Sequence, residues 1–387
     1  MKASRGELFL LAGSLLLALV LVEILLRFVL FSGAFPALAT PVAQFLSTPG
    51  TDDSYRLELA ARFAGNPPDD PALATFDSTL GHVARPRTPS NTLGLAEERG
   101  YSIAELQGQE VMLFFGNSFT EGFTEYSEKI PQLLDSIFSD VRVLNLGVMG
   151  YGLDQMYLRM TQVIGLFDRP HLVFGVLFDD LDRVAYALRE TPKPYFDVKG
   201  ETLRLRNVPI SPRVRDWAEA YPPEERSYAV ALLQGGFNRA LKTHWAHDYA
   251  FGWTPGERTA GRERKQAVTT ALVRRIKADA DRREAKLTFV IFPHAEHVTH
   301  RGWREEFFIA LLDSVGADYI FLKPALLQRV QEQNLRWWRD VYRLQSHPTA
   351  AENRFLAGHI ARCLHERHGY ELSAASPAEL PPSCTAR

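Results

Sequence analysis

The N-terminal stretch of the chain limits its possible organisation more than any other feature. From Leu8 to Phe31 the residues are apolar or small except Glu23 and Arg27. About 24 helical residues, at ~1.5 Å each, are long enough to cross the ~30 Å hydrocarbon core of a bilayer. Glu23 and Arg27 are spaced i,i+4, so they share one helix face and can pair near the outer end. We predict a transmembrane anchor over residues 1–31.

Charge around this stretch predicts its orientation. Lys2 and Arg5 precede it, and no charged residue occurs from Phe28 to Gly50. By the positive-inside rule, the N-terminus is cytoplasmic and the bulk of the chain is extracytoplasmic, which means periplasmic in a Gram-negative cell. The alternative is a cleaved signal peptide, because Ala37–Ala39 has the small-x-small form. The apolar run is longer than the usual 7–15 residues of a signal peptide.

Composition narrows the remaining classes. The formal net charge of -2 argues against a nucleic-acid partner, since phosphate binding needs a basic surface. No P-loop, Cys-x-x-Cys pair or fixed-period repeat occurs, and no cofactor is expected. An oxidising compartment would let Cys363 and Cys384 form a disulfide, the alternative being two unpaired small apolar residues.

Short apolar runs alternate with amphipathic stretches along most of the chain. The expected strands are Val111–Phe115, Val141–Leu146, His171–Leu177, Leu287–Phe292 and Asp318–Phe321. The expected helices are Glu128–Phe138, Asp154–Gly165, Arg262–Arg282, Gly302–Val315 and one from Pro348 to about His365. Continuous apolarity indicates strands buried on both faces, as in a parallel sheet. We predict an α/β fold with a doubly wound parallel sheet of about five strands in a flavodoxin-like order.

The expected organisation has four parts. Residues 1–31 form the anchor, 32–75 a Pro-, Ala- and Gly-rich linker, 76–370 the α/β domain and 371–387 a C-terminal tail. An insertion at about 189–254 interrupts the domain. It begins with a predicted hairpin, Tyr195–Val198 and Thr202–Arg206 around a Gly turn, and continues with aromatic residues.

Candidate site residues follow the strands, because ligands bind outside the carboxyl ends of strands in open α/β sheets. Ser118 follows a Gly-containing turn and can act as an acyl-transfer nucleophile. Gly150 belongs to a Gly-rich segment whose N–H groups can approach an oxyanion. Asp179 follows the third strand, and His347 stands before the last helix, where it can take the Ser118 proton. The alternatives are a turn serine, a turn glycine, a solvated Asp pair and a helix-capping histidine.

These segments resemble the SGNH (GDSL-type) hydrolases. Residues 116–122 (Gly-Asn-Ser-Phe-Thr-Glu-Gly) are similar to the family's first block, and 145–152, 178–180 and 346–348 are similar to its second, third and fifth blocks. Residues 76–81 and 90–94 resemble the lead-in of membrane-anchored members. The resemblance implies Ser118 as nucleophile, His347 as general base, and the N–H groups of Ser118 and Gly150 as oxyanion donors.

Three positions depart from the family pattern. Asn117 replaces the Asp before the nucleophile. Asp179 stands where an Asn side chain donates to the oxyanion, and a carboxylate there would repel it. Gln345 replaces the Asp that orients the base, and Asp340 or Glu352 are the nearby acids that could substitute for it.

The sequence therefore predicts a serine-dependent ester hydrolase or O-acyltransferase acting on an extracytoplasmic acyl ester, such as an O-acetylated glycan. The alternatives are an inactive SGNH-like module for glycan binding or polysaccharide export, and a lipid-ester hydrolase. No metal is expected, because the spacing of His294, Glu296, His297 and His300 is not that of a His-Glu-x-x-His zinc site.

Overall fold

The structure is a computed structural model of the 387-residue chain. It describes residues 4–47, 52–64, 76–84, 103–189, 191–200, 202–223, 227–233, 255–295, 298, 302–343, 347–374, 380–381 and 383–384. The chain divides into two compact units. The first comprises Met1–Leu73, Tyr186–Pro192 and Pro209–Gly261, and the second Ala74–Ala185, Lys193–Val208 and Arg262–Arg387.

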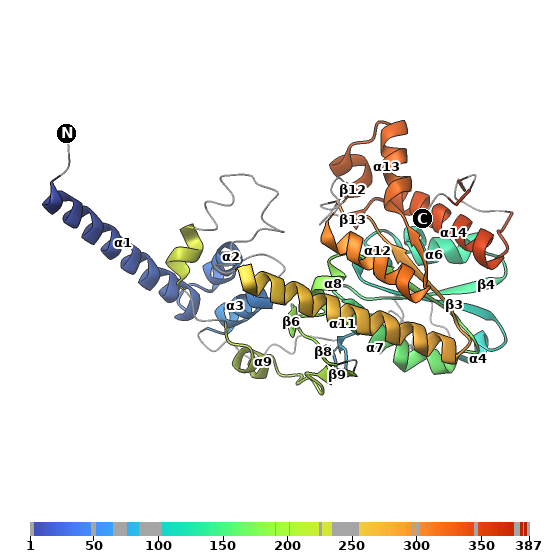
Figure 1. Cartoon of the computed structure of the whole chain (residues 1–387), viewed down its shortest axis with the longest axis horizontal. Helices are drawn as coiled ribbons and strands as arrows, with labels where there is room; N and C mark the ends of the chain where they lie inside the picture. Colours follow the sequence, from blue (N-terminus) through green and yellow to red (C-terminus); the bar gives the residue numbers. More distant parts are fainter. Residues whose placement is uncertain are drawn as a thin grey trace. The chain divides into compact units, whose positions relative to one another are not determined.

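The second unit is built on a five-stranded parallel sheet (Figure 1). Its strands are β3 (Glu110–Gly116), β4 (Val141–Gly147), β5 (His171–Val176), β10 (Lys286–Ile291) and β11 (Asp318–Phe321). Their spatial order is β11-β10-β5-β3-β4, and every neighbouring pair is parallel. Numbered along the chain, this order is 2-1-3-4-5, the flavodoxin-like doubly wound arrangement. The predicted fold class and all five predicted strands are confirmed.

Helices cover both faces of this sheet. One face packs against α7 (Leu153–Val163), α11 (Pro255–Arg282) and α12 (Trp303–Val315). The other packs against α6 (Ile130–Ile137), α13 (Lys323–Glu332) and α14 (Ala350–His368). In β3, Val111, Leu113 and Phe115 face the first layer, whereas Met112 and Phe114 face the second. This burial on both faces explains why the strands are apolar throughout.

The remaining described elements of the second unit are short. They are β1 (Phe76–Asp77), β2 (Gly81–His82), α4 (Ile103–Leu106), α5 (Ser118–Glu121), η1 (Tyr126–Glu128), η2 (Ile164–Leu166), α8 (Asp180–Arg183), β8 (Tyr195–Lys199), β9 (Thr202–Arg206), η4 (Trp337–Val341), β12 (Tyr342–Arg343) and β13 (His347–Pro348). The strands β8 and β9 pair antiparallel, so the predicted hairpin is confirmed. The predicted disulfide between Cys363 and Cys384 is also present.

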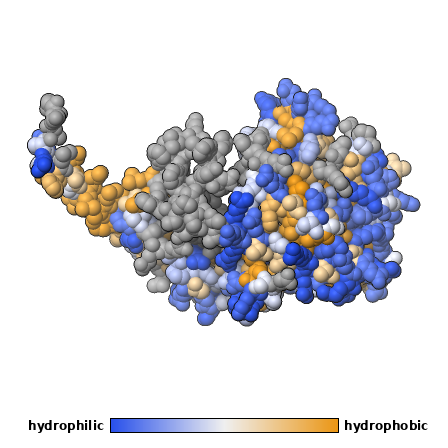
Figure 2. All heavy atoms as spheres, in the orientation of Figure 1, coloured by the Kyte–Doolittle hydropathy of each residue, from blue (hydrophilic) through white to orange (hydrophobic). Residues whose placement is uncertain are grey.

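The first unit contains α1 (Arg5–Phe31), α2 (Pro36–Leu46), α3 (Asp52–Phe63), β6 (Leu188–Arg189), β7 (Thr191–Pro192) and α9 (Val214–Ala220). Among the described residues, α1 is the one helix long and apolar enough to cross a membrane, and Figure 2 shows its apolar surface. Residues 32–75, expected to be a linker, instead hold α2 and α3. The reason is that Ala39, Ala43 and Leu46 repeat at helical spacing and are buried, a pattern hidden by small residues and Pro41.

Candidate active site

A tight turn after β3 positions Ser118 as the first residue of the short helix α5. The Asn117 side chain caps this helix, because its Oδ1 accepts a hydrogen bond of 2.8 Å from the Phe119 N–H. Gly116 allows the chain to fold back so closely that a Cβ there would lie 1.9 Å from Thr120 Oγ1. Only a glycine fits at position 116 of this turn without a steric clash.

His347 lies beside Ser118 although 229 positions separate them in the sequence. Its Nε2 is 2.8 Å from Ser118 Oγ, the spacing at which a ring nitrogen can take the hydroxyl proton. The imidazole packs against the rings of Phe123 and Phe119, with centroids 4.2 and 5.0 Å away. The structure thus brings together the two residues predicted to carry the chemistry.

Gly150 lies in the loop after β4, with a φ of 82° that favours glycine. The neighbouring Met149 holds this loop: its N–H donates to the Glu121 carboxylate, and its carbonyl accepts from His82 Nε2 at 2.8 Å. Within the described residues, the N–H groups of Ser118 and Gly150 donate no hydrogen bond to another protein atom. Both donors remain available for a ligand.

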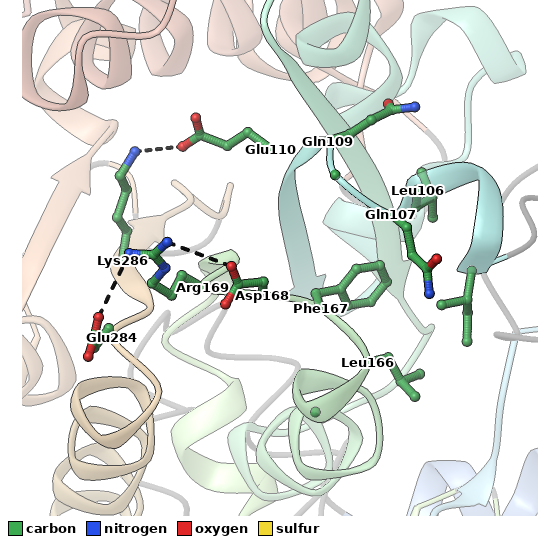
Figure 3. Close-up of a pocket in the computed structure, with 13 residues that line it drawn as sticks. Leu106, Gln107, Gln109, Glu110, Leu166, Phe167, Asp168, Arg169, Glu284 and Lys286 are labelled. Carbon is green, nitrogen blue, oxygen red and sulfur yellow. Dashed lines mark hydrogen bonds and ion pairs between the residues drawn. The ribbon is translucent and has the colours of Figure 1, made fainter.

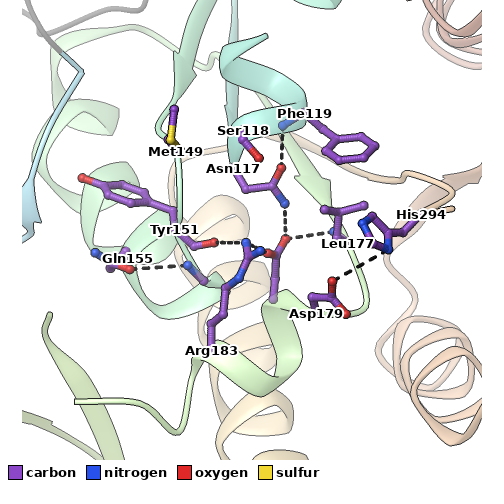
Figure 4. A network of polar contacts seen from close by, with 12 residues as sticks. Asn117, Ser118, Phe119, Met149, Tyr151, Gln155, Leu177, Asp179, Arg183 and His294 are labelled. Atoms are coloured by element: carbon purple, nitrogen blue, oxygen red, sulfur yellow. Dashed lines mark hydrogen bonds and ion pairs between the residues drawn. The ribbon is translucent and has the colours of Figure 1, made fainter. Parts of the chain in front are cut away.

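Asp179 faces a histidine that sequence reasoning considered only as a metal ligand. One Asp179 carboxylate oxygen is 4.0 Å from His294 Nδ1, and one third of the Asp179 side chain is exposed (Figure 4). The ring of His294 also lies 6.0 Å from that of Phe119, the residue after Ser118. Asp179 is therefore near the Ser118 turn, and its role in binding an oxyanion stays a prediction.

The adjacent Asp180 is the residue that sequence reasoning missed. It is fully buried, not one of a solvated pair. Its Oδ2 accepts from Asn117 Nδ2 at 2.6 Å and from the Leu177 N–H at 2.8 Å, and its Oδ1 accepts from Arg183 (Figure 4). The same guanidinium donates to the Tyr151 carbonyl at 2.9 Å. One carboxylate therefore links the ends of β3 and β5 and, through Arg183, the loop after β4.

Electrostatics at Asp180 reflect this burial. Loss of water raises the pKa of Asp180 to about 6, although the Arg183 charge and the hydrogen bonds from Leu177 and Asn117 oppose the rise. A neutral amide at position 117 suits such a neighbour, because a second carboxylate would repel it. The Asn117 departure from the family pattern is thus matched by Asp180. Two features of the sequence could have indicated the role of Asp180. An amide replaces the expected acid at position 117, and two acids follow the third strand at positions 179 and 180.

The structure describes only part of the surroundings of His347, so the expected place of Gln345 behind it stays a prediction. Gln345 lies outside the described residues. The Asp340 carboxylate accepts from a backbone N–H four residues earlier, and Glu352 is buried beside Arg329 at 3.5 Å. Burial raises the pKa of Glu352 to about 7. Among the described residues, neither acid makes a direct hydrogen bond to His347, so neither orients the base by direct contact.

A second buried ion pair joins the segment before β8 to α7 and to the segment that carries Arg183. Lys193, just before β8, donates to the Asp154 carboxylate in the first turn of α7, and both side chains are almost fully buried. Lys193 also donates to the carbonyls of Arg183 at 3.1 Å and Pro194 at 2.8 Å. The start of the hairpin is therefore fixed to the segment that carries Arg183.

The structure describes only part of the segment 294–300, in which the sequence analysis considered a zinc site. Of the residues considered, His294 is described, whereas Glu296, His297 and His300 lie outside the described residues. In the part of the chain that the structure describes, no group of three or more His, Cys, Asp or Glu side chains is placed to hold a metal ion.

A pocket of about 780 Å³ lies at the opposite edge of the sheet (Figure 3). Glu110 and Lys286, which begin β3 and β10, line it and form an ion pair of 2.7 Å. Leu166 and Phe167 line another wall. The pocket contains no predicted site residue, because Ser118 and His347 belong to the carboxyl edge.

Comparisons with known proteins give limited likeness. No family model matches the sequence, and no curated protein matches it. Among solved structures, a member of the lipolytic G-D-S-L family from Veillonella parvula is similar, with a TM-score of 0.34 and 10% identity over 64% of this chain and 94% of that one. A catalytic mutant of an acetylxylan esterase from Geobacillus stearothermophilus has a TM-score of 0.36 and 13% identity, over 68% of this chain and 95% of that one. TM-scores below 0.5 do not establish a shared family.

Proposed function

We propose that this protein is a serine-dependent ester hydrolase or O-acyltransferase of SGNH type, with Ser118 as nucleophile and His347 as general base. The observation that carries the proposal is the 2.8 Å contact between Ser118 Oγ and His347 Nε2. It occurs at the carboxyl edge of a doubly wound sheet, where such folds bind ligands. The Ser118 N–H has no acceptor among the described residues, so it can donate to an oxyanion.

The reaction has two half-steps. Ser118 Oγ attacks the acyl carbonyl carbon while its proton passes to His347 Nε2, and the resulting oxyanion accepts hydrogen bonds from the N–H groups of Ser118 and Gly150. The ester C–O bond then breaks as His347 returns the proton to the leaving alcohol, which gives an acyl-Ser118 enzyme. Water completes hydrolysis, or an acceptor hydroxyl completes transfer, with His347 again removing the proton.

We propose an extracytoplasmic substrate, such as an O-acetylated glycan. The support is α1, together with the Cys363–Cys384 disulfide, since disulfides persist in oxidising compartments. In this arrangement α1 spans the membrane once with its N-terminus in the cytoplasm. The domain then meets its substrates on the extracytoplasmic side of the membrane that α1 crosses.

One observation favours a second candidate, an inactive glycan-binding or export-accessory module. By the resemblance, Asp179 stands where an Asn side chain would donate to the oxyanion, and one of its carboxylate oxygens lies 4.0 Å from His294 Nδ1. A carboxylate there weakens oxyanion binding unless it is neutralised. Measured turnover separates the two candidates.

The test is turnover of a small acetyl ester by the full chain in detergent or liposomes. Ser118→Ala should lower kcat/KM by at least ~10³-fold, His347→Ala by a similar factor, and the double variant by little more, because the two side chains act as one unit. Thermal stability should change little for Ser118→Ala, since its hydroxyl does not support the core.

Thr288→Val is the matched control, because it removes another hydroxyl that contacts histidine, at the amino edge of the sheet. It should keep the wild-type kcat/KM. Wild-type turnover no faster than that of Ser118→Ala would contradict the enzyme proposal and favour the binding module.

A further inference from the structure

A charged pair inside α1 is bound by a segment about 200 residues further along the chain. Arg27 Nε donates to Glu23 Oε1 at 2.7 Å. The other oxygen of Glu23 accepts from the Ala229 N–H at 2.8 Å and from Ser227 Oγ at 3.0 Å. The Arg27 guanidinium also lies 5.0 Å from the centroid of the Tyr228 ring. The segment 227–233, of which 228–233 is helical, is therefore fixed to the last turns of α1.

Helix length places this contact within the membrane boundary. The uncharged part of α1, from Leu8 to Val22, has about 15 residues and spans only about 22 Å. A hydrocarbon core of ~30 Å needs about 20 helical residues. Counted from Leu8, such a stretch ends at Arg27. If α1 crosses the bilayer, Glu23 lies just inside the outer boundary of the hydrocarbon, and the segment bound to it lies at the same depth. The two N–H and O–H donors reduce the cost of placing the carboxylate there.

Segment 227–233 and α2 carry no charged side chain and expose apolar ones. Segment 227–233 (Ser-Tyr-Ala-Val-Ala-Leu-Leu) has no charged side chain, and Val230 and Leu233 are 38% and 59% exposed. The helix α2 also has no charged side chain, and on it and just before it Leu38 and Phe35 are 53% and 43% exposed. Exposed apolar groups of this size, next to a membrane-spanning helix, are typical of a surface that contacts lipid.

The same elements already have a buried side. Leu30, Ala39, Ala43, Tyr228 and Ala231 form one cluster in the first unit, each at most 7% exposed. The exposed apolar side chains therefore lie outside a core that is complete without them. They form an additional apolar surface on elements that pack beside α1.

We propose that these elements form a membrane-embedded collar, defined as Glu23–Phe31 of α1, α2 and residues 227–233, that inserts its apolar face into the outer leaflet. The partner is the lipid itself, at the boundary between headgroups and acyl chains. The inference rests on α1 spanning the bilayer and is independent of the proposed catalysis. It gives the insertion a role as a second membrane contact beside the anchor.

The test uses the full chain in liposomes with one nitroxide label per variant, attached to an introduced cysteine. The native cysteines form a disulfide, so only the new thiol reacts. Leu233→Cys reports on the collar, and Leu38→Cys repeats the measurement on α2. Leu17→Cys reports on the anchor, and Trp338→Cys, at a side chain 65% exposed in the second unit, is the water-facing control. Collisions with oxygen, which concentrates in lipid, are compared with collisions with a water-soluble nickel chelate.

The collar predicts that the oxygen-to-nickel ratio at Leu233 and Leu38 is several-fold higher than at Trp338 and lower than at Leu17. A Trp338-like ratio at both collar sites, with a high ratio at Leu17, would overturn the collar while leaving the anchor in place. A Trp338-like ratio at Leu17 as well would overturn both. Neither outcome alters the turnover test of Ser118.

Discussion

The two edges of the central sheet each bring a hydroxyl group to a histidine. At the carboxyl edge, Ser118 contacts His347. At the amino edge, Thr288 Oγ1 lies 2.9 Å from His171 Nε2 and 3.2 Å from the Nε2 of His368. The amino edge also has an acid, because Asp318 Oδ2 lies 2.9 Å from Thr288 Oγ1 and 3.2 Å from His368 Nε2.

The difference lies in backbone setting and access. Thr288 lies near the start of β10, an interior strand, and is fully buried, so no substrate carbonyl reaches its hydroxyl. Its hydroxyl already donates to Asp318, and the ring nitrogens of the buried His171 lie 2.9 Å from Thr288 Oγ1 and from the Tyr370 hydroxyl. Burial lowers the pKa of His171 well below its usual value, which keeps the ring neutral. The three residue types alone therefore do not make a site.

At the carboxyl edge, the chain provides what the amino edge lacks. Ser118 begins a helix after a glycine turn, and the N–H groups of Ser118 and Gly150 have no acceptor among the described residues. These two N–H groups are the oxyanion donors that we propose. We conclude that the amino-edge network stabilises the fold and that the carboxyl edge is the candidate for chemistry.

At the carboxyl edge, we expect the largest change in the free energy of unfolding from Asn117→Asp. Asn117 Nδ2 lies 2.6 Å from Asp180 Oδ2, so the variant places two buried carboxylates in contact. We expect a loss of about 2–4 kcal/mol in the free energy of unfolding at pH 8, since two such groups cannot both ionise without mutual repulsion. Denaturant unfolding of the full chain in detergent measures this loss.

The double variant Asn117→Asp/Asp180→Asn is the control, because it restores one amide and one carboxylate. It should recover part of the lost stability at pH 8. A single variant as stable as wild type would mean that Asn117 and Asp180 do not form the contact described here.

A smaller effect is expected at the amino edge from Asp318→Asn. Burial raises the pKa of Asp318, but hydrogen bonding with His368 and the charge of Arg367 outweigh it and lower the pKa to about 2. The folded pKa is thus below the unfolded value of about 3.9, so this contribution is complete above about pH 4 and is lost as the pH falls toward 2. Because the carboxylate is 31% exposed, we expect it to contribute only about 1–2 kcal/mol.

Asp318→Asn should therefore lower the free energy of unfolding at pH 7 and weaken the dependence of that free energy on pH between pH 4 and 2. Ester turnover should stay unchanged. Unfolding measured across that pH range tests it. Asp281→Asn, which removes a 58% exposed partner of Lys277, is the matched control and should change stability by less than about 0.5 kcal/mol. A large loss of turnover in Asp318→Asn would contradict the division between the two edges.

Much of this contrast could be predicted from the sequence. The five strands were predictable because both faces of each are buried, which makes them continuously apolar. The meeting of Ser118 and His347 was predictable because strand ends gather at one edge and both residues lie in family-like blocks. The expected positions of Asn117 and Gly150 at this edge follow from the same argument.

Other features depend on side-chain directions that no local pattern encodes. Which of Asp179 and Asp180 turns inward is decided by the first turn of α8. The pairing of Lys193 with Asp154 joins two single charges 39 positions apart. The helices α2 and α3 were missed because alanine and proline weaken the apolar periodicity of their segment.

The most direct test of the central claim is covalent labelling by a fluorophosphonate, which reacts with activated serine hydroxyls. The full chain is incubated with the probe, and the modified residue is identified by mass spectrometry of its peptides. We predict one adduct on Ser118, none on Thr288, and loss of the adduct in His347→Ala. An unlabelled Ser118 in a wild-type protein that turns over ester, or an adduct on Ser118 that persists without His347, would contradict the account.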